Sequence, residues 1–233
     1  MSVVDIVIIS YNGLLVPQAV ESLEFRMNNV DTNIIVQQAK QSIPLNVNAG
    51  FERVNTDWWV LFNDDWEALD DGWLDKLLQF GESDPEIGFV SCRIMFDDGT
   101  LNHAGYFISE NGIAGNKKRG KPDTMLPDDY LRYAHPILIR SDMFRELGGY
   151  DSDTFKGSQY ADIDFVYRVG KSPWKIFFAG SVRLLHHYRM NKTTNAVKER
   201  VRYENETMFR AKHGFKKQKG YLKKKQVHKR KRK

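Results

Sequence analysis

Residues 3–9 form a short segment that is apolar at every position except Asp5. All its apolar residues are valine or isoleucine, whose branched side chains favour strands. A strand with one solvated face alternates apolar and polar residues, whereas a nearly continuous run is typical of a strand covered on both faces. Such strands belong to parallel sheets that helices flank. The segment therefore predicts an α/β protein with a mostly parallel central sheet.

A helix and a second strand follow this segment. Apolar residues recur every four positions and make one stripe of a helix over 14–27, at Leu15, Ala19, Leu23 and Met27. Residues 33–37 are then expected to form another strand. Strand, helix and strand in this order predict a βαβ unit with parallel strands.

Similar patterns continue along the chain, whose 233 residues suit one domain. Further strands are expected at 58–62, 87–95, 104–109, 134–139, 174–178 and 181–185. Further helices are expected at 72–78, 141–147, 160–169 and 196–213. Residues 110–129 show little periodicity and many Gly, Lys, Pro and Asp residues, which predicts a lid or an acceptor-side loop.

The net charge of +5 hides two opposite parts. Residues 216–233 contain eleven Lys and Arg and no acidic residue, so residues 1–215 carry a net charge of −6. We expect 214–233 to be a flexible basic tail drawn to an anionic membrane surface. Association with nucleic acid and a solubilising role are the alternatives. Nothing in the rest of the chain resembles a base-reading module, so nucleic acid is not the expected partner.

The single cysteine, Cys92, excludes an internal disulfide and lies in an apolar run, where a buried, unreactive thiol is expected. No stretch approaches the roughly eighteen apolar residues of a membrane-spanning helix, and no signal-peptide pattern opens the chain. These features lead us to expect a cytoplasmic protein that is at most peripheral to a membrane.

Asn63, Asp64 and Asp65 come directly after the predicted strand 58–62. In an open parallel sheet, ligands bind beyond the carboxyl ends of the strands. Two adjacent carboxylates there suit Mg²⁺ or Mn²⁺, which would neutralise the charge of a diphosphate leaving group. The alternative interpretation is a polar turn that caps the next helix.

Ordered motifs surround this triplet. They are the segments 4–13, 48–51 with Asn55, 61–66, 139–140 with 148–151, and 161–168. Together, over residues 3–190, they resemble the inverting family 2 glycosyltransferases, especially the rhamnosyltransferase-like branch. The resemblance implies a GT-A fold, with a Rossmann-like, mostly parallel sheet flanked by helices. It also implies metal-dependent transfer of a sugar from a nucleoside-diphosphate donor to a hydroxyl of a glycan, lipid-linked saccharide or glycoprotein.

The resemblance assigns donor contacts at the end of the first strand and after the third. Asp65 would ligate Mn²⁺ or Mg²⁺, and Asp64 would lie near the donor ribose. Tyr11 would pack on the nucleobase, and Ser10 and Asn12 flank it at the same strand end. An ordinary core-edge tyrosine is the alternative for Tyr11.

Two further donor contacts are expected at Gly50, where the backbone could approach the nucleotide closely, and at Arg53, which could bind phosphate or base. Arg53 could equally be a solvated surface charge. Where relatives often carry an acid that reads the base, this chain has Gln37. The identity of the nucleotide is therefore open.

Asp162 occupies the position of the catalytic base that removes the acceptor hydroxyl proton. Ala161 replaces the usual neighbouring glutamate. His186 and His187 follow the last predicted strand, and one of them, with His187 preferred, would contact the metal or the diphosphate. A helix-terminal carboxylate and a polar strand end are the alternative roles.

Trp66 could line the sugar pocket, whereas His103 and His135, which stand alone in the sequence, are expected to be satisfied structural histidines. Within a domain spanning 1–213, residues 1–100 would mainly bind the nucleotide sugar. Residues 101–195 would supply the acceptor side and the base, and 196–213 a C-terminal helix. A non-catalytic relative that binds a sugar nucleotide or glycan is the main alternative function, and a nucleotidyltransferase is disfavoured because no Gly-rich basic loop follows the first strand.

Overall fold

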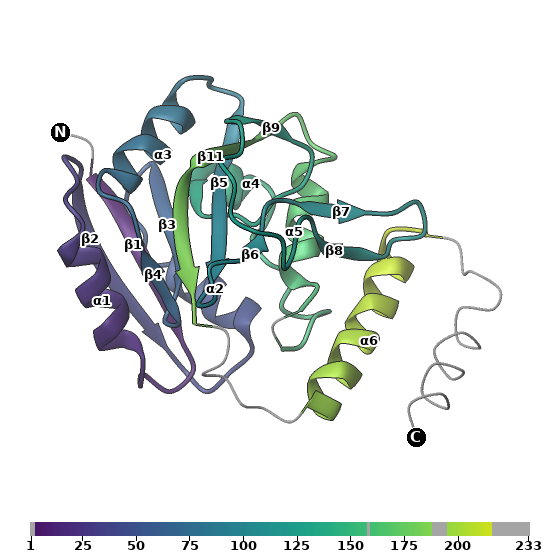
Figure 1. Cartoon of the computed structure of the whole chain (residues 1–233). Coiled ribbons are helices and arrows are strands. Elements are labelled where there is room, and N and C mark those ends of the chain that lie inside the picture. Colours follow the sequence, from purple (N-terminus) through teal and green to yellow (C-terminus); the bar gives the residue numbers. More distant parts are fainter. Residues whose placement is uncertain (1–2, 158, 188–194, 216–233) are drawn as a thin grey trace.

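The computed structural model describes residues 3–157, 159–187 and 195–215 (Figure 1). Most of the basic tail, residues 216–233, lies outside the described residues. Among the residues that are described, no helix is long and apolar enough to cross a membrane.

The N-terminal part of the sheet is parallel. Strand β1 (Val3–Ser10) lies between β2 (Asp31–Gln38) and β3 (Trp58–Asn63) and pairs with both in parallel. Helix α1 (Val16–Phe25) connects β1 to β2, so the predicted βαβ unit is confirmed. Because these strands run in the same direction, the residues that follow β1 and β3 meet at one edge of the sheet.

The other half of the sheet mixes directions. Its order is β2-β1-β3-β10-β5-β11-β4, in which β10 (Leu138–Arg140) runs antiparallel to both neighbours. The long strands β5 (Ile87–Phe96) and β11 (Lys175–His186) pair in parallel, and β4 (Trp66–Ala68) lies antiparallel to β11. Short strands β6 (Leu101–His103) and β9 (Asp129–Leu131) pair with β5 and β11. The expected α/β class is confirmed, with parallel strands in a mixed sheet.

Helices cover both faces of the sheet (Figure 1). Val4, Ile6 and Ile8 of β1 pack in one core with α1 and α3 (Trp73–Glu82). Val7 and Ile9 pack in the opposite core with α2 (Ile43–Phe51), α4 (Ser141–Glu146) and α5 (Ala161–Val169). Alternate residues of β1 therefore enter two different cores, which explains its nearly continuous apolar sequence.

Several boundaries differ from the sequence expectations. Helix α2 was not predicted, because polar Asn46 and Asn48 interrupt its apolar positions. The expected strands 174–178 and 181–185 form one strand, β11, whose register shifts between Ala179 and Arg183. The segment 110–129 is not without structure, since β8 (Ala114–Asn116) pairs with β7 (Tyr106–Ile108).

Helix α6 (Asn195–Lys212) lies at the end of the molecule remote from β2 (Figure 1). Phe209 joins it to the core that contains α5. Lys212 and the following His213 both bond to the buried Asp164 of α5. Elsewhere in the core, Cys92 is buried and unpaired, as expected, and burial raises the pKa of its thiol.

Candidate functional site

Ser10 and Asp64 meet at the carboxyl ends of β1 and β3. The Ser10 hydroxyl donates to Asp64 Oδ2 at 2.5 Å and accepts the backbone N–H of Gly13 at 2.8 Å. Burial raises the pKa of Asp64, and the adjacent Asp65 carboxylate raises it further, although the bond from Ser10 acts in the opposite direction. A cation near both carboxylates would relieve this repulsion.

Asp65 is buried, with 7% of its surface exposed, and faces the end of β11. His186 Nε2 lies 3.2 Å from Asp65 Oδ2. The backbone N–H of His187 donates to the Asp65 carbonyl at 2.9 Å. The fold thus brings the expected ribose contact Asp64, the expected metal ligand Asp65 and one of the two expected histidines to one place.

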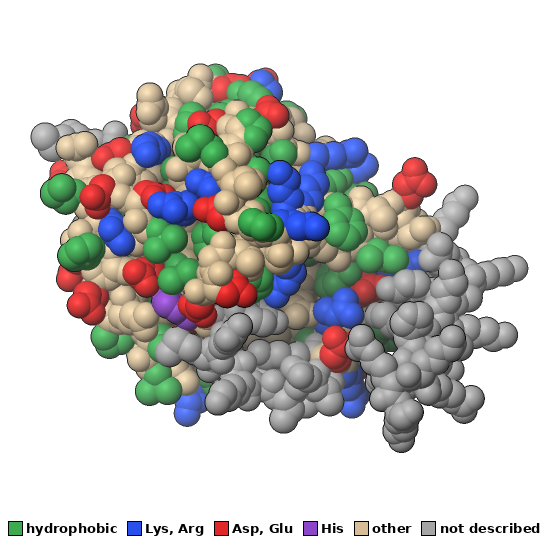
Figure 2. All heavy atoms as spheres, viewed as in Figure 1, with side chains coloured by type: hydrophobic (Ala, Val, Ile, Leu, Met, Phe, Trp, Pro, Cys, Tyr) green, Lys and Arg blue, Asp and Glu red, His purple; other side chains and the backbone are tan. Residues whose placement is uncertain are grey.

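The ring of His187, the residue that follows β11, makes other contacts. Its Nδ1 lies 2.8 Å from Asp97 Oδ1, and its Nε2 lies 3.2 Å from Glu67 Oε2 and 3.2 Å from the Gln18 amide. The histidine beside Asp65 is therefore His186 and not the preferred His187. Figure 2 shows a histidine among acidic side chains near the carboxyl end of β11.

Within the described part of the chain, no group of three or more His, Cys, Asp and Glu residues could hold a metal ion by itself. Mg²⁺ bound through one or two carboxylates commonly completes its ligand set with substrate phosphates and water. The neighbouring carboxylates of Asp64 and Asp65 fit a cation held in this shared way. The protein groups alone do not form a closed metal cage.

Tyr11 and Asn12 continue from Ser10 at the protein surface. Tyr11 is 57% exposed, so its ring is accessible to a ligand. The side chain of Asn12 accepts the backbone N–H of Leu14 at 3.1 Å and shapes the turn. Gly13 adopts a φ of 77°, and a Cβ there would lie 2.5 Å from the Gln38 amide oxygen. This glycine allows the turn to pack against the end of β2.

Gly50 and Arg53 contact strands β1 and β2 near Val7 and Val36. Gly50 is buried in α2, and a Cβ would lie 2.5 Å from Val7 Cγ1, so the close approach is to β1. Arg53 donates to the Val36 carbonyl at 2.8 Å, on the edge strand. The chain just beyond it, at Asn55, donates to Asp5 near the start of β1, at the opposite end of that strand from Ser10.

Asp162, in the first turn of α5, lies in a second polar group. The Tyr106 hydroxyl donates to Asp162 Oδ2 at 2.6 Å and lies 2.9 Å from His135 Nδ1. His135 Nδ1 is itself 3.7 Å from Asp162 Oδ2. Burial raises the pKa of the Asp162 carboxyl. The hydrogen bond and charge of His135, together with the hydrogen bond from Tyr106, lower it by more, so the pKa of Asp162 lies below its usual value.

His103 and His135 both make hydrogen bonds within the fold, as expected of structural histidines. His135 faces Asp162, and its backbone N–H donates to His103 Nε2 at 2.9 Å. The ring of His103 contacts that of Tyr106. Sequence reasoning missed the contacts of Tyr106 and His135 with Asp162 because 56 and 27 positions separate these residues from it. The one available signal was His135 itself, a histidine inside an otherwise apolar segment.

Trp66 stands between the two polar groups. Its ring centroid lies 5.3 Å from that of His135 and 6.3 Å from that of His186. Only 2% of Trp66 is exposed, so it forms an internal wall and does not face an open sugar pocket. Its indole N–H has no hydrogen-bond partner among the described residues. Rings therefore connect the surroundings of Asp65 with those of Asp162.

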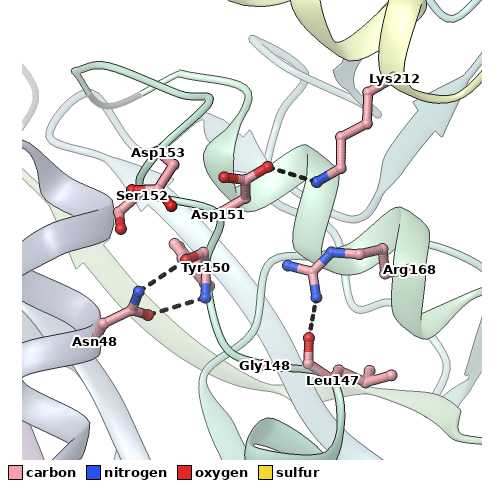
Figure 3. A pocket seen from close by; sticks show the side chains of 9 residues that line it. All are labelled: Asn48, Leu147, Gly148, Tyr150, Asp151, Ser152, Asp153, Arg168 and Lys212. Carbon is pink, nitrogen blue, oxygen red and sulfur yellow. Dashed lines mark hydrogen bonds and ion pairs between the residues drawn. The ribbon is translucent and has the colours of Figure 1, made fainter.

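A separate hollow of about 390 Å³ lies between α2, α5 and α6 (Figure 3). None of the sequence-predicted site residues lines it. Asp151 pairs with Lys212 at 2.8 Å, and Arg168 donates to the Leu147 carbonyl. These charged side chains are engaged in contacts between elements. The hollow is therefore distinct from the carboxylates at the strand ends.

A solved structure shares this architecture. GalNAc-T7, crystallised with UDP, GalNAc and Mn²⁺, matches 79% of the chain and 44% of its own length, with a TM-score of 0.59 and 13% identity. The chain has a GT-A glycosyltransferase-like fold. At this identity, the likeness establishes the fold alone.

Sequence comparison gives two distant relatives of the chain. The O-antigen biosynthesis protein RfbC of Myxococcus xanthus is 27% identical over 152 residues, 60% of this chain and 12% of that protein. The uncharacterized protein y4gI of Sinorhizobium fredii is 23% identical over 162 residues, 63% of this chain and 17% of that protein. The chain thus spans less than a fifth of either relative. No protein-family model matches it.

Proposed function

We propose that this chain is a metal-dependent inverting glycosyltransferase of the family 2 type, from the rhamnosyltransferase-like branch. It moves a sugar from a nucleoside-diphosphate donor to a hydroxyl of a glycan, lipid-linked saccharide or glycoprotein. The observation that carries the proposal is the meeting of Asp64, Asp65 and His186 beyond the parallel strands of a GT-A-like fold. The structural relative was crystallised with UDP and Mn²⁺, and the distant relative RfbC is named for O-antigen biosynthesis.

In this proposal, the carboxylates at the strand ends bind the donor. Asp65 holds Mn²⁺ or Mg²⁺, and Asp64, oriented by Ser10, contacts the ribose. The bound cation would neutralise charge on the diphosphate as the bond to the sugar breaks. Tyr11, exposed beside this group, stacks on the nucleobase.

Asp162 acts as the base. Its lowered pKa keeps it ionised at neutral pH, so it can accept a proton. The acceptor oxygen bonds to the anomeric carbon and transfers its proton to Asp162. The bond between the anomeric carbon and the diphosphate oxygen breaks, and its electron pair leaves with the diphosphate. Tyr106 and His135 hold the carboxylate in place.

The remaining assignments are also proposals. Residues 1–100 chiefly bind the donor, 101–195 supply the acceptor side and the base, and 196–213 form the closing helix. The basic tail 214–233 attracts the protein to an anionic membrane surface from the cytoplasm, at about 1 kcal/mol per basic residue near that surface. A lipid-linked acceptor would be concentrated there.

The test measures release of nucleoside diphosphate and transfer of sugar. The full chain is incubated with Mn²⁺, a panel of sugar nucleotides and acceptor extracts. Wild-type protein should release diphosphate, and Asp65→Ala should not. Asp31→Ala, which changes an exposed acid at the start of β2, serves as the matched control. The anomeric configuration of the product, read by NMR, tests inversion.

Two results would argue against this function. Equal release of nucleoside diphosphate by wild-type protein and Asp65→Ala would show that Asp65 does not hold a metal ion that the reaction requires. Metal-dependent nucleotide binding without turnover on any acceptor would instead favour a non-catalytic relative, for which the loss of an acid at Ala161 is the sequence support.

A further inference from the structure

A chain of hydrogen bonds connects the loop 117–121 with the Asp65 carboxylate. Arg119 Nη1 donates to Asn102 Oδ1. Asn102 Nδ2 lies 2.6 Å from His186 Nδ1. His186 Nε2 lies 3.2 Å from Asp65 Oδ2. Two intermediate side chains therefore join a surface loop to the buried carboxylate.

The chemistry of these groups sets one direction for the chain. A guanidinium can only donate hydrogen bonds, so the Asn102 amide atom that faces Arg119 must be the oxygen. The amide nitrogen then faces His186 and donates, which requires an unprotonated Nδ1. A neutral imidazole carries its one proton on the other nitrogen, Nε2, and this proton points at Asp65.

Arg119 and Asn102, the first two members of this hydrogen-bond chain, make further contacts that hold them in place. The Arg119 guanidinium lies over the Phe96 ring, 4.7 Å from its centroid. Asn102 is 5% exposed and lies in β6. Its backbone carbonyl accepts a hydrogen bond from the Asn116 side-chain amide at 3.0 Å.

The loop itself is also fixed. Gly120 N–H donates to the Leu101 carbonyl at 2.7 Å, and Leu101 N–H donates to the Lys121 carbonyl at 2.8 Å. The loop thus pairs with Leu101 of β6 directly after Arg119. It belongs to a region in which Lys and Arg side chains gather on the face seen in Figure 2.

We infer that Arg119 is a positioning residue that acts through Asn102 to keep the Nε2 proton of His186 on Asp65. His186 then orients the Asp65 carboxylate as a hydrogen-bond donor. The relevance of this carboxylate to a cation rests on the proposed function, and the position of the proton in the metal-free protein does not.

The test reads that proton directly. Long-range ¹H–¹⁵N NMR spectra of ¹⁵N-histidine-labelled, metal-free protein distinguish a protonated Nε2 from a protonated Nδ1. The signals are assigned with His186→Gln, and those of His187 report whether each variant is folded. Wild-type His186 should carry its proton on Nε2.

Three variants test whether the hydrogen-bond chain sets the position of the His186 proton. Arg119→Met removes the donor and frees the amide to turn, so both tautomers should appear. Arg119→Lys keeps a donor and should restore the wild-type signal. Asn102→Asp presents only acceptors, so Nδ1 should become protonated.

A wild-type His186 with a protonated Nδ1 would overturn the inference, as would an Arg119→Met spectrum identical to that of the wild type. The measurement needs neither donor nor acceptor. It therefore stands if the transferase activity is absent, and its failure would leave that activity untouched.

Discussion

His186 Nε2 lies 3.2 Å from Asp65 Oδ2, although 121 positions separate the two residues in the chain. The contact exists because β4 folds back antiparallel onto β11, with Trp66 opposite His186. The same register sets the next residues side by side, since the backbone N–H of His187 donates to the Asp65 carbonyl at 2.9 Å. The strand pairing therefore brings both histidines close to Asp65, and the direction of each side chain decides which imidazole meets the carboxylate.

Replacing Asp65 by Asn should abolish cation-dependent nucleotide binding while preserving the fold. The side chain keeps its size but loses the charge that would attract Mn²⁺. We expect Mn²⁺ affinity to fall by more than about 100-fold, the upper end of losses from outer-shell changes. Calorimetry with Mn²⁺ and nucleoside diphosphates checks this, with Asp31→Asn as control. Unchanged Mn²⁺ affinity would exclude Asp65 as a ligand.

The two histidines should differ in effect. His186→Ala removes the contact with Asp65 and should weaken cation-dependent nucleotide binding by about 10- to 100-fold. His187→Ala removes contacts with Asp97 and Glu67 and should change that binding much less. Titrations of both variants with Mn²⁺ and nucleoside diphosphate under the same conditions measure this difference in affinity. A larger loss from His187→Ala would reverse the assignment.

Replacing Asp162 by Asn should reduce sugar transfer and spare donor binding. Loss of a positioned base costs about 10²- to 10⁴-fold in rate. The proposed nucleotide contacts lie at the ends of β1 and β3, on the other side of the Trp66 wall, so donor affinity should stay near the wild-type value. The rate of sugar transfer and the affinity for the donor are measured in separate experiments. An equal loss in both would indicate a structural role for Asp162.

The pH dependence of transfer should change in Tyr106→Phe. In the proposed mechanism Asp162 works as a base when ionised, so activity should be lost as the pH falls through its pKa, which lies below the usual value in the wild type. Removing the Tyr106 donor raises that pKa, and the acid limb of the pH–rate profile should move to higher pH. Tyr130→Phe, whose hydroxyl bonds to the remote Asp84, should leave the limb in place.

Gly50→Ala should destabilise the protein. The new methyl group would lie 2.5 Å from Val7 Cγ1, so helix α2 or strand β1 must shift. Overpacking of this kind costs about 1–3 kcal/mol of unfolding free energy. Chemical denaturation measures it, and Glu52→Ala, an exposed change just after the same helix, should stay within about 0.5 kcal/mol of wild type. An equally small effect at Gly50 would contradict the packing explanation.

Much of the fold could be predicted because its signals are local. The apolar run at 3–9 and the four-residue periodicity after it depend on near neighbours in sequence, and both elements formed, although the helix ends at Phe25 and leaves Met27 exposed. Helix α2 escaped notice because its buried Asn46 is polar and bonds outside the helix, to the backbone carbonyl of Ala39 and the side chain of Gln41. The sequence pattern around it is consequently mixed.

The candidate site divides in the same way. Sequence alone determined that Asp64 and Asp65 follow a buried strand, and that Ser10 and Tyr11 follow another. Parallel pairing then places both strand ends at one edge, which a periodic pattern can predict.

Tertiary structure decided which distant side chains join them. It turned His186 toward Asp65 and His187 away, surrounded Asp162 with Tyr106 and His135, and set Gly50 against β1. These relations depend on strand register and on side-chain direction between segments far apart in the chain. Hydrophobic periodicity carries information about which face of an element is buried, and none about which distant residue lies opposite it.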